Sequence, residues 1–183
     1  RKIEVKDGVV LLNGQKIKFR GVNRHDSDPF TGFTISVEQA MLDLRLMKEH
    51  NINAIRTSHY PNAPWFPQLC SDYGFYVISE SDLESHGTTS LYGGNGTDKY
   101  CMLARDPMFE EANLDRQKRN VIRDKNCASV VIWSLGNEAG YGENFEKSGR
   151  WVKAYDPSRL LHYERSVEEP TGHTNDVSML DLF

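Results

Sequence analysis

The chain has 183 residues, 38% of them hydrophobic and 26% charged, an ordinary composition for one soluble globular domain. Its formal net charge of −4, without a Lys/Arg stripe, argues against nucleic acid as a partner. No apolar run approaches the roughly 18 residues of a membrane span, so no membrane partner is expected. The three cysteines lack CxxC spacing, which argues against disulfides or a zinc site and favours a reducing, cytoplasmic location.

Short β-rich runs alternate with helical stretches, which predicts an α/β chain with a parallel sheet covered by helices. The turn residues Asn13-Gly14 indicate a hairpin of Val9–Leu12 with Ile17–Arg20, and the second run is also expected to be the first barrel strand. The later strands are predicted at Ala54–Thr57, Phe75–Ser79, Val130–Ser134 and Leu160–Tyr163, with Val177–Leu180 as a candidate sixth strand.

Sequence signals for helix ends predict four helices between these strands. The first covers Val37–His50, because Ser36 and Gln39 have the spacing of a capping box. The second follows Pro64, the third runs from Asp106-Pro107 to about Asp124, and the fourth covers about Glu143–Tyr155. The remaining long stretch, Gly87–Ala104, is expected to form an irregular loop above the sheet.

Polar residues gather where four predicted strands end. In parallel α/β sheets the loops at the carboxyl ends of the strands converge over one opening, where binding and catalysis occur. A lone histidine or carboxylate there is more often a helix cap or a solvated surface group. The clustering of several such side chains at one face of the sheet is what indicates a functional site. Glu138 stands apart because it follows Val130–Trp133, a run expected to be fully buried. The four strand-end segments are Gly21–Asp26, Arg56–Pro61, Glu80–Gly87 and Ser134–Glu138.

Cleavage of a glycosidic bond needs side chains of this kind. A carboxylic acid must protonate the leaving oxygen, and in retaining enzymes a second carboxylate roughly 5–5.5 Å away bonds to the sugar. Apolar neighbours such as Trp133 and Leu135 would raise the pKa of Glu138, so that it still carries a proton near neutral pH. The amide of Asn137 can hold a sugar hydroxyl.

Four segments carry recognisable motifs: Arg20–His25, Ser58–Asn62, Glu84–Gly87 and Ile132–Glu138. In order and spacing they closely resemble the barrel domain of glycoside hydrolase family 2. The resemblance is greatest to the large bacterial β-galactosidases of that family, because the Asn-Arg-His and Glu-x-His-Gly elements occur together. It implies an incomplete TIM (β/α)8 barrel, with about five to six of the eight strands, over residues 1–183 as one domain.

The resemblance also implies roles for individual residues. Glu138 matches the acid/base catalyst of a retaining double displacement on terminal β-galactosides, and Asn137 matches the neighbour that contacts the sugar 2-hydroxyl. His25 and His59 match histidines that hold galactose hydroxyls. The family's nucleophilic glutamate lies in a Cys-Glu-Tyr or similar context that this chain lacks, so the chain alone is expected to be inactive.

A metal site is a further implication of the resemblance. Glu84, His86 and Glu138 match the ligands of an active-site magnesium ion, Mg²⁺. Magnesium prefers oxygen ligands and usually keeps several waters, so one imidazole is tolerable in its coordination sphere. A cation on Glu138 would favour the ionised carboxylate and oppose the raised pKa that a general acid needs.

Other interpretations stay open at this point. The same motifs resemble β-glucuronidases and β-mannosidases of the family, and a non-enzymatic sugar- or metal-binding fragment is also compatible with them. A barrel with five or six strands leaves open edges, so we expect self-association or a complementing chain. Alternatively, the stretch from about Val177 covers the open edge, with Leu180, Leu182 and Phe183 against the exposed core.

Overall fold

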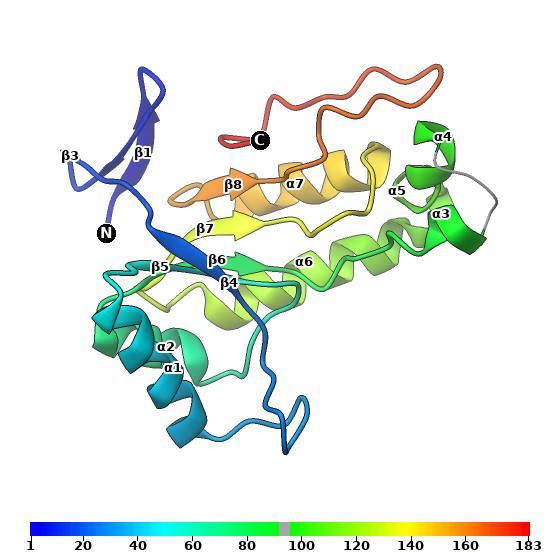
Figure 1. Cartoon of the computed structure of the whole chain (residues 1–183). Helices are drawn as coiled ribbons and strands as arrows, with labels where there is room; N and C mark the ends of the chain where they lie inside the picture. The colour runs from blue at the N-terminus through cyan, green and yellow to red at the C-terminus, as the bar shows by residue number, and fades with distance from the viewer. Residues whose placement is uncertain (92–95) are drawn as a thin grey trace.

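The structure is a computed structural model that describes residues 1–91 and 96–183 (Figure 1). Its amino-terminal part is a small antiparallel sheet of β1 (Ile3–Lys6), β2 (Val9–Leu12) and β3 (Gln15–Lys16). Leu12 pairs with Gln15, so Asn13-Gly14 is the two-residue turn that the sequence predicted. Both turn residues have positive φ, 50° and 78°, as a type I′ turn requires.

A parallel sheet of five strands forms the body of the molecule, and its strand order follows the chain, as in a barrel. The predicted barrel architecture is therefore confirmed over five consecutive strands. Both predictions for Ile17–Arg20 are wrong, because residues 17–20 form no strand. The hairpin partner of β2 is β3 instead, and the first barrel strand begins at Gly21. The strands are β4 (Gly21–Arg24), β5 (Ala54–Thr57), β6 (Tyr76–Glu80), β7 (Val130–Ser134) and β8 (Leu160–His162).

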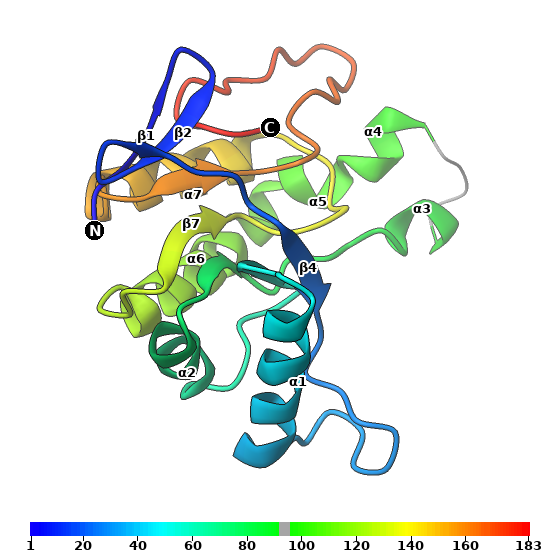
Figure 2. The ribbon, with the colours of Figure 1, turned by 60° about the vertical axis from the view of Figure 1, so that its left-hand side comes forward.

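Four longer helices follow the strands, close to the predicted positions. They are α1 (Val37–Glu49), α2 (Phe66–Tyr73), α6 (Glu110–Asp124) and α7 (Glu143–Tyr155). Ser36 and Gln39 form the predicted capping box, since the backbone N–H of each residue donates to the side chain of the other. Figures 1 and 2 show α1 beside α2 and α6 beside α7, so the helices cover the sheet in two pairs.

The stretch predicted as an irregular loop is partly helical. It contains α3 (Thr88–Leu91), α4 (Thr97–Tyr100) and α5 (Met102–Arg105), while positions 92–95 lie outside the described residues. The helix predicted from Asp106-Pro107 begins as a 3-10 turn, η1 (Pro107–Phe109), before α6. Asp106 caps this turn by accepting a hydrogen bond from the Met108 N–H at 2.9 Å.

Strand β7 lies at the centre of the core. All five of its residues are buried, as the apolar run predicted, because both faces of the strand are covered. Trp133 belongs to the larger core between the sheet and the helices, whereas Ile132 belongs to a smaller cluster with Ile3 and residues of β2. The antiparallel hairpin therefore packs on part of the barrel sheet.

The carboxyl-terminal segment runs beside β8. The predicted strand at Val177–Leu180 is wrong, and the segment makes one parallel bridge, between His162 and Leu182. Leu180 is buried in the larger core and Leu182 packs on the smaller cluster, as predicted. Phe183 is 69% exposed, so its predicted burial is wrong. In residues 1–91 and 96–183, no helix has the length and apolar character needed to cross a membrane.

Candidate active site

The turn after β7 positions the candidate catalytic pair, Asn137 and Glu138. The Asn137 N–H donates to the Leu83 carbonyl at 2.8 Å, which ties this turn to the loop after β6. Gly136 has φ 146°, and a Cβ atom there would lie 2.5 Å from the Leu83 carbonyl oxygen, so the close approach requires glycine. Glu138 itself has φ 39°, in the left-handed region that few non-glycine residues adopt.

The side chain of Asn137 is fixed by two partners. Its Oδ1 accepts a hydrogen bond from Arg56 Nη2 at 2.9 Å, and its Nδ2 donates to Glu84 Oε2 at 2.5 Å. One partner is a pure donor and the other a carboxylate acceptor, so they determine which way the amide faces. Asn137 is buried, and Glu84 also forms a parallel bridge with it.

Glu138 lies between two basic groups. Its Oε2 is 2.6 Å from His86 Nδ1, and its Oε1 is 3.5 Å from Arg165 Nη2. The hydrogen bond with His86, helped by the charge of Arg165, lowers the pKa of Glu138 below its ordinary value. The expected rise in this pKa is therefore wrong for this structure. Trp133 and Leu135 are buried in the core, while the Glu138 side chain is 36% exposed.

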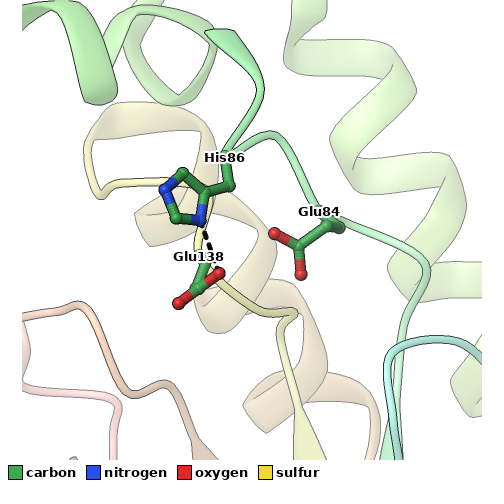
Figure 3. A group of neighbouring side chains, drawn as sticks. All are labelled: Glu84, His86 and Glu138. Atoms are coloured by element: carbon green, nitrogen blue, oxygen red, sulfur yellow. Dashed lines mark hydrogen bonds and ion pairs between the residues drawn. The ribbon is translucent and has the colours of Figure 1, made fainter. Parts of the chain in front are cut away.

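Glu84, His86 and Glu138 form a compact cluster (Figure 3). Each residue offers one ligand atom, and these atoms all lie within 4.8 Å of one another. Two atoms bound at about 2.1 Å to the same magnesium ion are at most about 4.2 Å apart, so a modest inward movement would suffice. Two carboxylates and one imidazole are an acceptable donor set for Mg²⁺ or Mn²⁺. The residues present therefore fit a divalent cation.

The two candidate sugar-binding histidines lie together at the ends of β4 and β5. Their rings pack edge to face, with centroids 5.5 Å apart and an interplanar angle of 83°. Nδ1 of His59 is 2.7 Å from Oε1 of Glu80, which is completely buried. Arg56 connects this part of the site to Asn137, because its Nε donates to Glu80 Oε2 at 2.6 Å.

The structure thus gathers all six predicted site residues at the carboxyl ends of β4 to β7, in two connected groups. His25 and His59 form one group, and Asn137, Glu84, His86 and Glu138 form the other. Sequence reasoning gave no individual role to the residues that join and flank these groups, although two of them lie in its strand-end segments. They are Arg56, Glu80 and Arg165. The available signal for Glu80 was its place as the last residue of an otherwise uncharged strand, Tyr76–Glu80.

Glu164 has a structural task beside this site. Its Oε1 accepts a hydrogen bond from the Glu138 N–H at 2.9 Å, and its other oxygen lies 3.1 Å from Arg165 Nε. These contacts help hold Glu138 in its left-handed conformation. They also bond Glu164 to the turn that carries Glu138.

Comparison with known proteins identifies the family. Residues 3–181 match the family model "Glycosyl hydrolases family 2, TIM barrel domain". The chain is 54% identical to a β-galactosidase of Actinobacillus pleuropneumoniae and 41% identical to one of Staphylococcus xylosus. Both matches cover 100% of this chain but only 20% and 18% of those proteins, so the chain spans about a fifth of their length.

Solved structures agree with this result. The crystal structure of Ruminococcus gnavus β-glucuronidase in complex with uronic isofagomine has a TM-score of 0.73 to this chain, at 26% sequence identity. The match covers 88% of this chain and 28% of that one. Family model, relatives and fold lead to one conclusion: the chain belongs to glycosyl hydrolase family 2, and its residues 3–181 correspond to the TIM barrel domain of that family.

Proposed function

We propose that this chain is part of a retaining β-galactosidase, in which Glu138 is the acid/base catalyst. The observation that carries the proposal is the placement of Glu138 at the carboxyl end of β7, beside Asn137 and the cluster with Glu84 and His86. Identity of 54% to a β-galactosidase, against 26% to a β-glucuronidase structure, favours a galactoside over a glucuronide.

The environment of Glu138 fits one half of this reaction directly. A retaining glycosidase uses one carboxyl group as an acid when the bond breaks and as a base when water attacks. The contacts with His86 and Arg165 favour the carboxylate form, which is the form that accepts a proton from water. For the acid step, Glu138 must carry a proton, so these contacts must weaken when substrate binds.

The neighbouring residues are proposed to hold the sugar. Asn137 would contact the 2-hydroxyl, and its amide is already oriented by Arg56 and Glu84. His25 and His59 would hold galactose hydroxyls from the adjacent strand ends. Hydrogen bonds that fix a substrate before reaction reduce the entropy cost of reaching the transition state.

Glu84, His86 and Glu138 are the residues that would hold a magnesium ion. The cation would supply positive charge that orders these side chains and favours an ionised Glu138. The compact geometry of the three ligand atoms supports this proposal.

A cytoplasmic location is also proposed. Cys70 and Cys101 are free and buried, and burial raises the pKa of the Cys70 thiol to about 12.

Turnover requires a second carboxylate, which we propose is supplied by barrel residues outside this chain. The test is hydrolysis of chromogenic β-galactoside and β-glucuronide by the purified chain, alone and mixed with the carboxyl-terminal barrel strands of the Actinobacillus relative. We expect negligible turnover by the chain alone and galactoside hydrolysis by the mixture. A chain that alone hydrolyses galactoside within about tenfold of a complete family member would contradict the proposal, as would a mixture that prefers the glucuronide.

A further inference from the structure

Glu80, the last residue of β6, is a completely buried carboxylate that has no role in the function proposed above. Burial raises the pKa of Glu80, while the charge of Arg56 and hydrogen bonds from Ser134 and His59 oppose this rise. Burying a charge is costly, and apolar residues of similar size often stabilise a core as well as a buried ion pair does. A structural role alone therefore does not explain this carboxylate.

Both oxygens of the Glu80 carboxylate are hydrogen-bonded to neighbouring side chains. Oε2 accepts from Arg56 Nε at 2.6 Å and from Ser134 Oγ at 2.7 Å, and Oε1 lies 2.7 Å from His59 Nδ1. The Glu80 N–H donates to Thr57 Oγ1 at 3.0 Å, which fixes the backbone as well. The carboxylate thus contacts the candidate sugar-binding histidine directly.

The contact with Glu80 determines how His59 can meet a ligand. A carboxylate only accepts hydrogen bonds, so the proton of a neutral His59 must be on Nδ1, which leaves Nε2 as an acceptor. An Nε2 acceptor can receive a hydrogen bond from a sugar hydroxyl. Without the carboxylate, the two neutral tautomers of His59 would compete, and one of them would present a donor instead.

The second contact, with Arg56, acts on the other side of the site. Glu80 holds Arg56 through Nε, and Arg56 then donates through Nη2 to Asn137 Oδ1 at 2.9 Å. This hydrogen bond turns the Asn137 amide so that Nδ2 faces Glu84. One carboxylate therefore orients both the amide beside Glu138 and the histidine of the neighbouring strand.

We propose that Glu80 is a positioning residue for sugar recognition, which fixes the Nδ1-protonated tautomer of His59 and the orientation of the Asn137 amide. The proposal rests on the function proposed above, because it assumes that His59 and Asn137 contact a sugar. Its structural part, the tautomer and the amide orientation, is measurable in this chain without any turnover.

The first experiment is ¹⁵N NMR of the histidine rings of the chain at mildly alkaline pH. We expect His59 to be protonated at Nδ1 in the unmodified chain and to become a mixture of tautomers in Glu80→Gln. Glu49→Gln changes an exposed carboxylate and is the control, with no expected effect. Ser134→Ala removes one hydrogen bond to Glu80 but keeps the carboxylate, so His59 should stay protonated at Nδ1 in this variant. This measurement can be made even if Glu80→Gln does not fold.

The second experiment uses the mixture with complementing barrel strands and a series of galactosides that each lack one hydroxyl. Glu80→Gln should lower kcat/KM for the full sugar by about 10²-fold. For the galactoside lacking the hydroxyl that His59 holds, the loss should be much smaller, because that hydrogen bond is already gone. The 2-deoxy galactoside should also show a smaller loss, because Asn137 is proposed to contact that hydroxyl. The remaining deoxy sugars should show the full loss, which separates a positioning effect from general damage to the fold.

A His59 ring protonated at Nε2 in the unmodified chain would overturn the proposal. So would equal losses of kcat/KM for every sugar in the deoxy series. Absence of galactoside turnover in the mixture, together with the expected tautomer change, would overturn the sugar-binding function and leave the orienting role of Glu80 in place.

Discussion

His86 Nδ1 and Glu138 Oε2 lie 2.6 Å apart, so the candidate acid/base carboxylate is hydrogen-bonded to an imidazole from the loop after β6. This contact is the largest cause of the lowered pKa of Glu138. It joins the loops after β6 and β7 through two residues that are 52 positions apart in the sequence. The pKa of the candidate acid/base group is thus lowered by a residue that the family resemblance associates with metal binding.

Replacing His86 with Ala should raise the pKa of Glu138, because the largest stabilising contact of the carboxylate is lost. ¹³C NMR titration of the Glu138 carboxyl group in the chain is the measurement. His50→Ala, which changes an exposed histidine at the end of α1, is the control and should leave this pKa unchanged. An unchanged Glu138 pKa in His86→Ala would show that His86 does not stabilise the carboxylate.

The same contact predicts a small dependence of stability on pH. The pKa of Glu138 is lower in the folded chain than its ordinary value of 4.5, so the ionised form stabilises the fold above that value. This contribution is lost as the pH falls through the folded pKa. Thermal unfolding of His86→Ala and of the unmodified chain should therefore differ less in acid than at neutral pH, and a difference that grew in acid would contradict the assignment.

Removing two of the three proposed magnesium ligands should abolish cation binding. Calorimetric titration with Mg²⁺ and Mn²⁺ should detect binding to the chain and none to the double variant Glu84→Ala, His86→Ala. The control is Glu111→Ala, an exposed carboxylate in the first turn of α6. Equal affinity of the chain and the double variant would remove the metal assignment, and loss of binding in the control would indicate nonspecific charge effects.

Gly136→Ala should destabilise the chain by at least about 2 kcal/mol. The new Cβ would lie 2.5 Å from the Leu83 carbonyl oxygen, and the φ of 146° is strained for alanine. The measurement is the free energy of unfolding in urea. Gly87→Ala has no atom within 4 Å of the added Cβ and should cost much less. Similar losses in both variants would mean that the close approach after β7 is not needed.

Self-association remains a prediction for this chain. The carboxyl-terminal segment covers the edge of β8, whereas in the described residues β4 pairs only with β5. An unpaired strand edge favours association, and association makes apparent stability depend on concentration. Sedimentation over a wide concentration range should therefore detect dimers that dissociate on dilution. A compact monomer at all concentrations would show that the β4 edge is tolerated.

Local signals in the sequence were sufficient to predict much of the fold. The Asn13-Gly14 turn and the Ser36 capping box were predicted because each depends on residues adjacent in the chain. The burial of β7 followed from its uninterrupted apolar run. Strand β4 was missed because Gly21–Arg24 contains a single apolar residue, so its strand character comes from pairing with the distant β5.

The site was only partly predictable for a similar reason. Motifs located Glu138, Asn137 and the histidines, because these residues lie in the loops that follow strands. The burial of Glu80 depends on Arg56, which is 24 residues away, and the pKa of Glu138 depends on His86, which is 52 residues away. No local pattern encodes such pairings, so the sequence alone led to the wrong direction for the Glu138 pKa.

The role of Glu138 as the acid/base catalyst is tested most directly by Glu138→Gln in the mixture with complementing barrel strands. General acid catalysis matters most for a poor leaving group and little for one that departs without a proton. The variant should therefore lose far more activity on lactose than on a dinitrophenyl β-galactoside, as measured by the kcat/KM of each. Equal losses on the two substrates, or no loss on lactose, would contradict the assignment of Glu138.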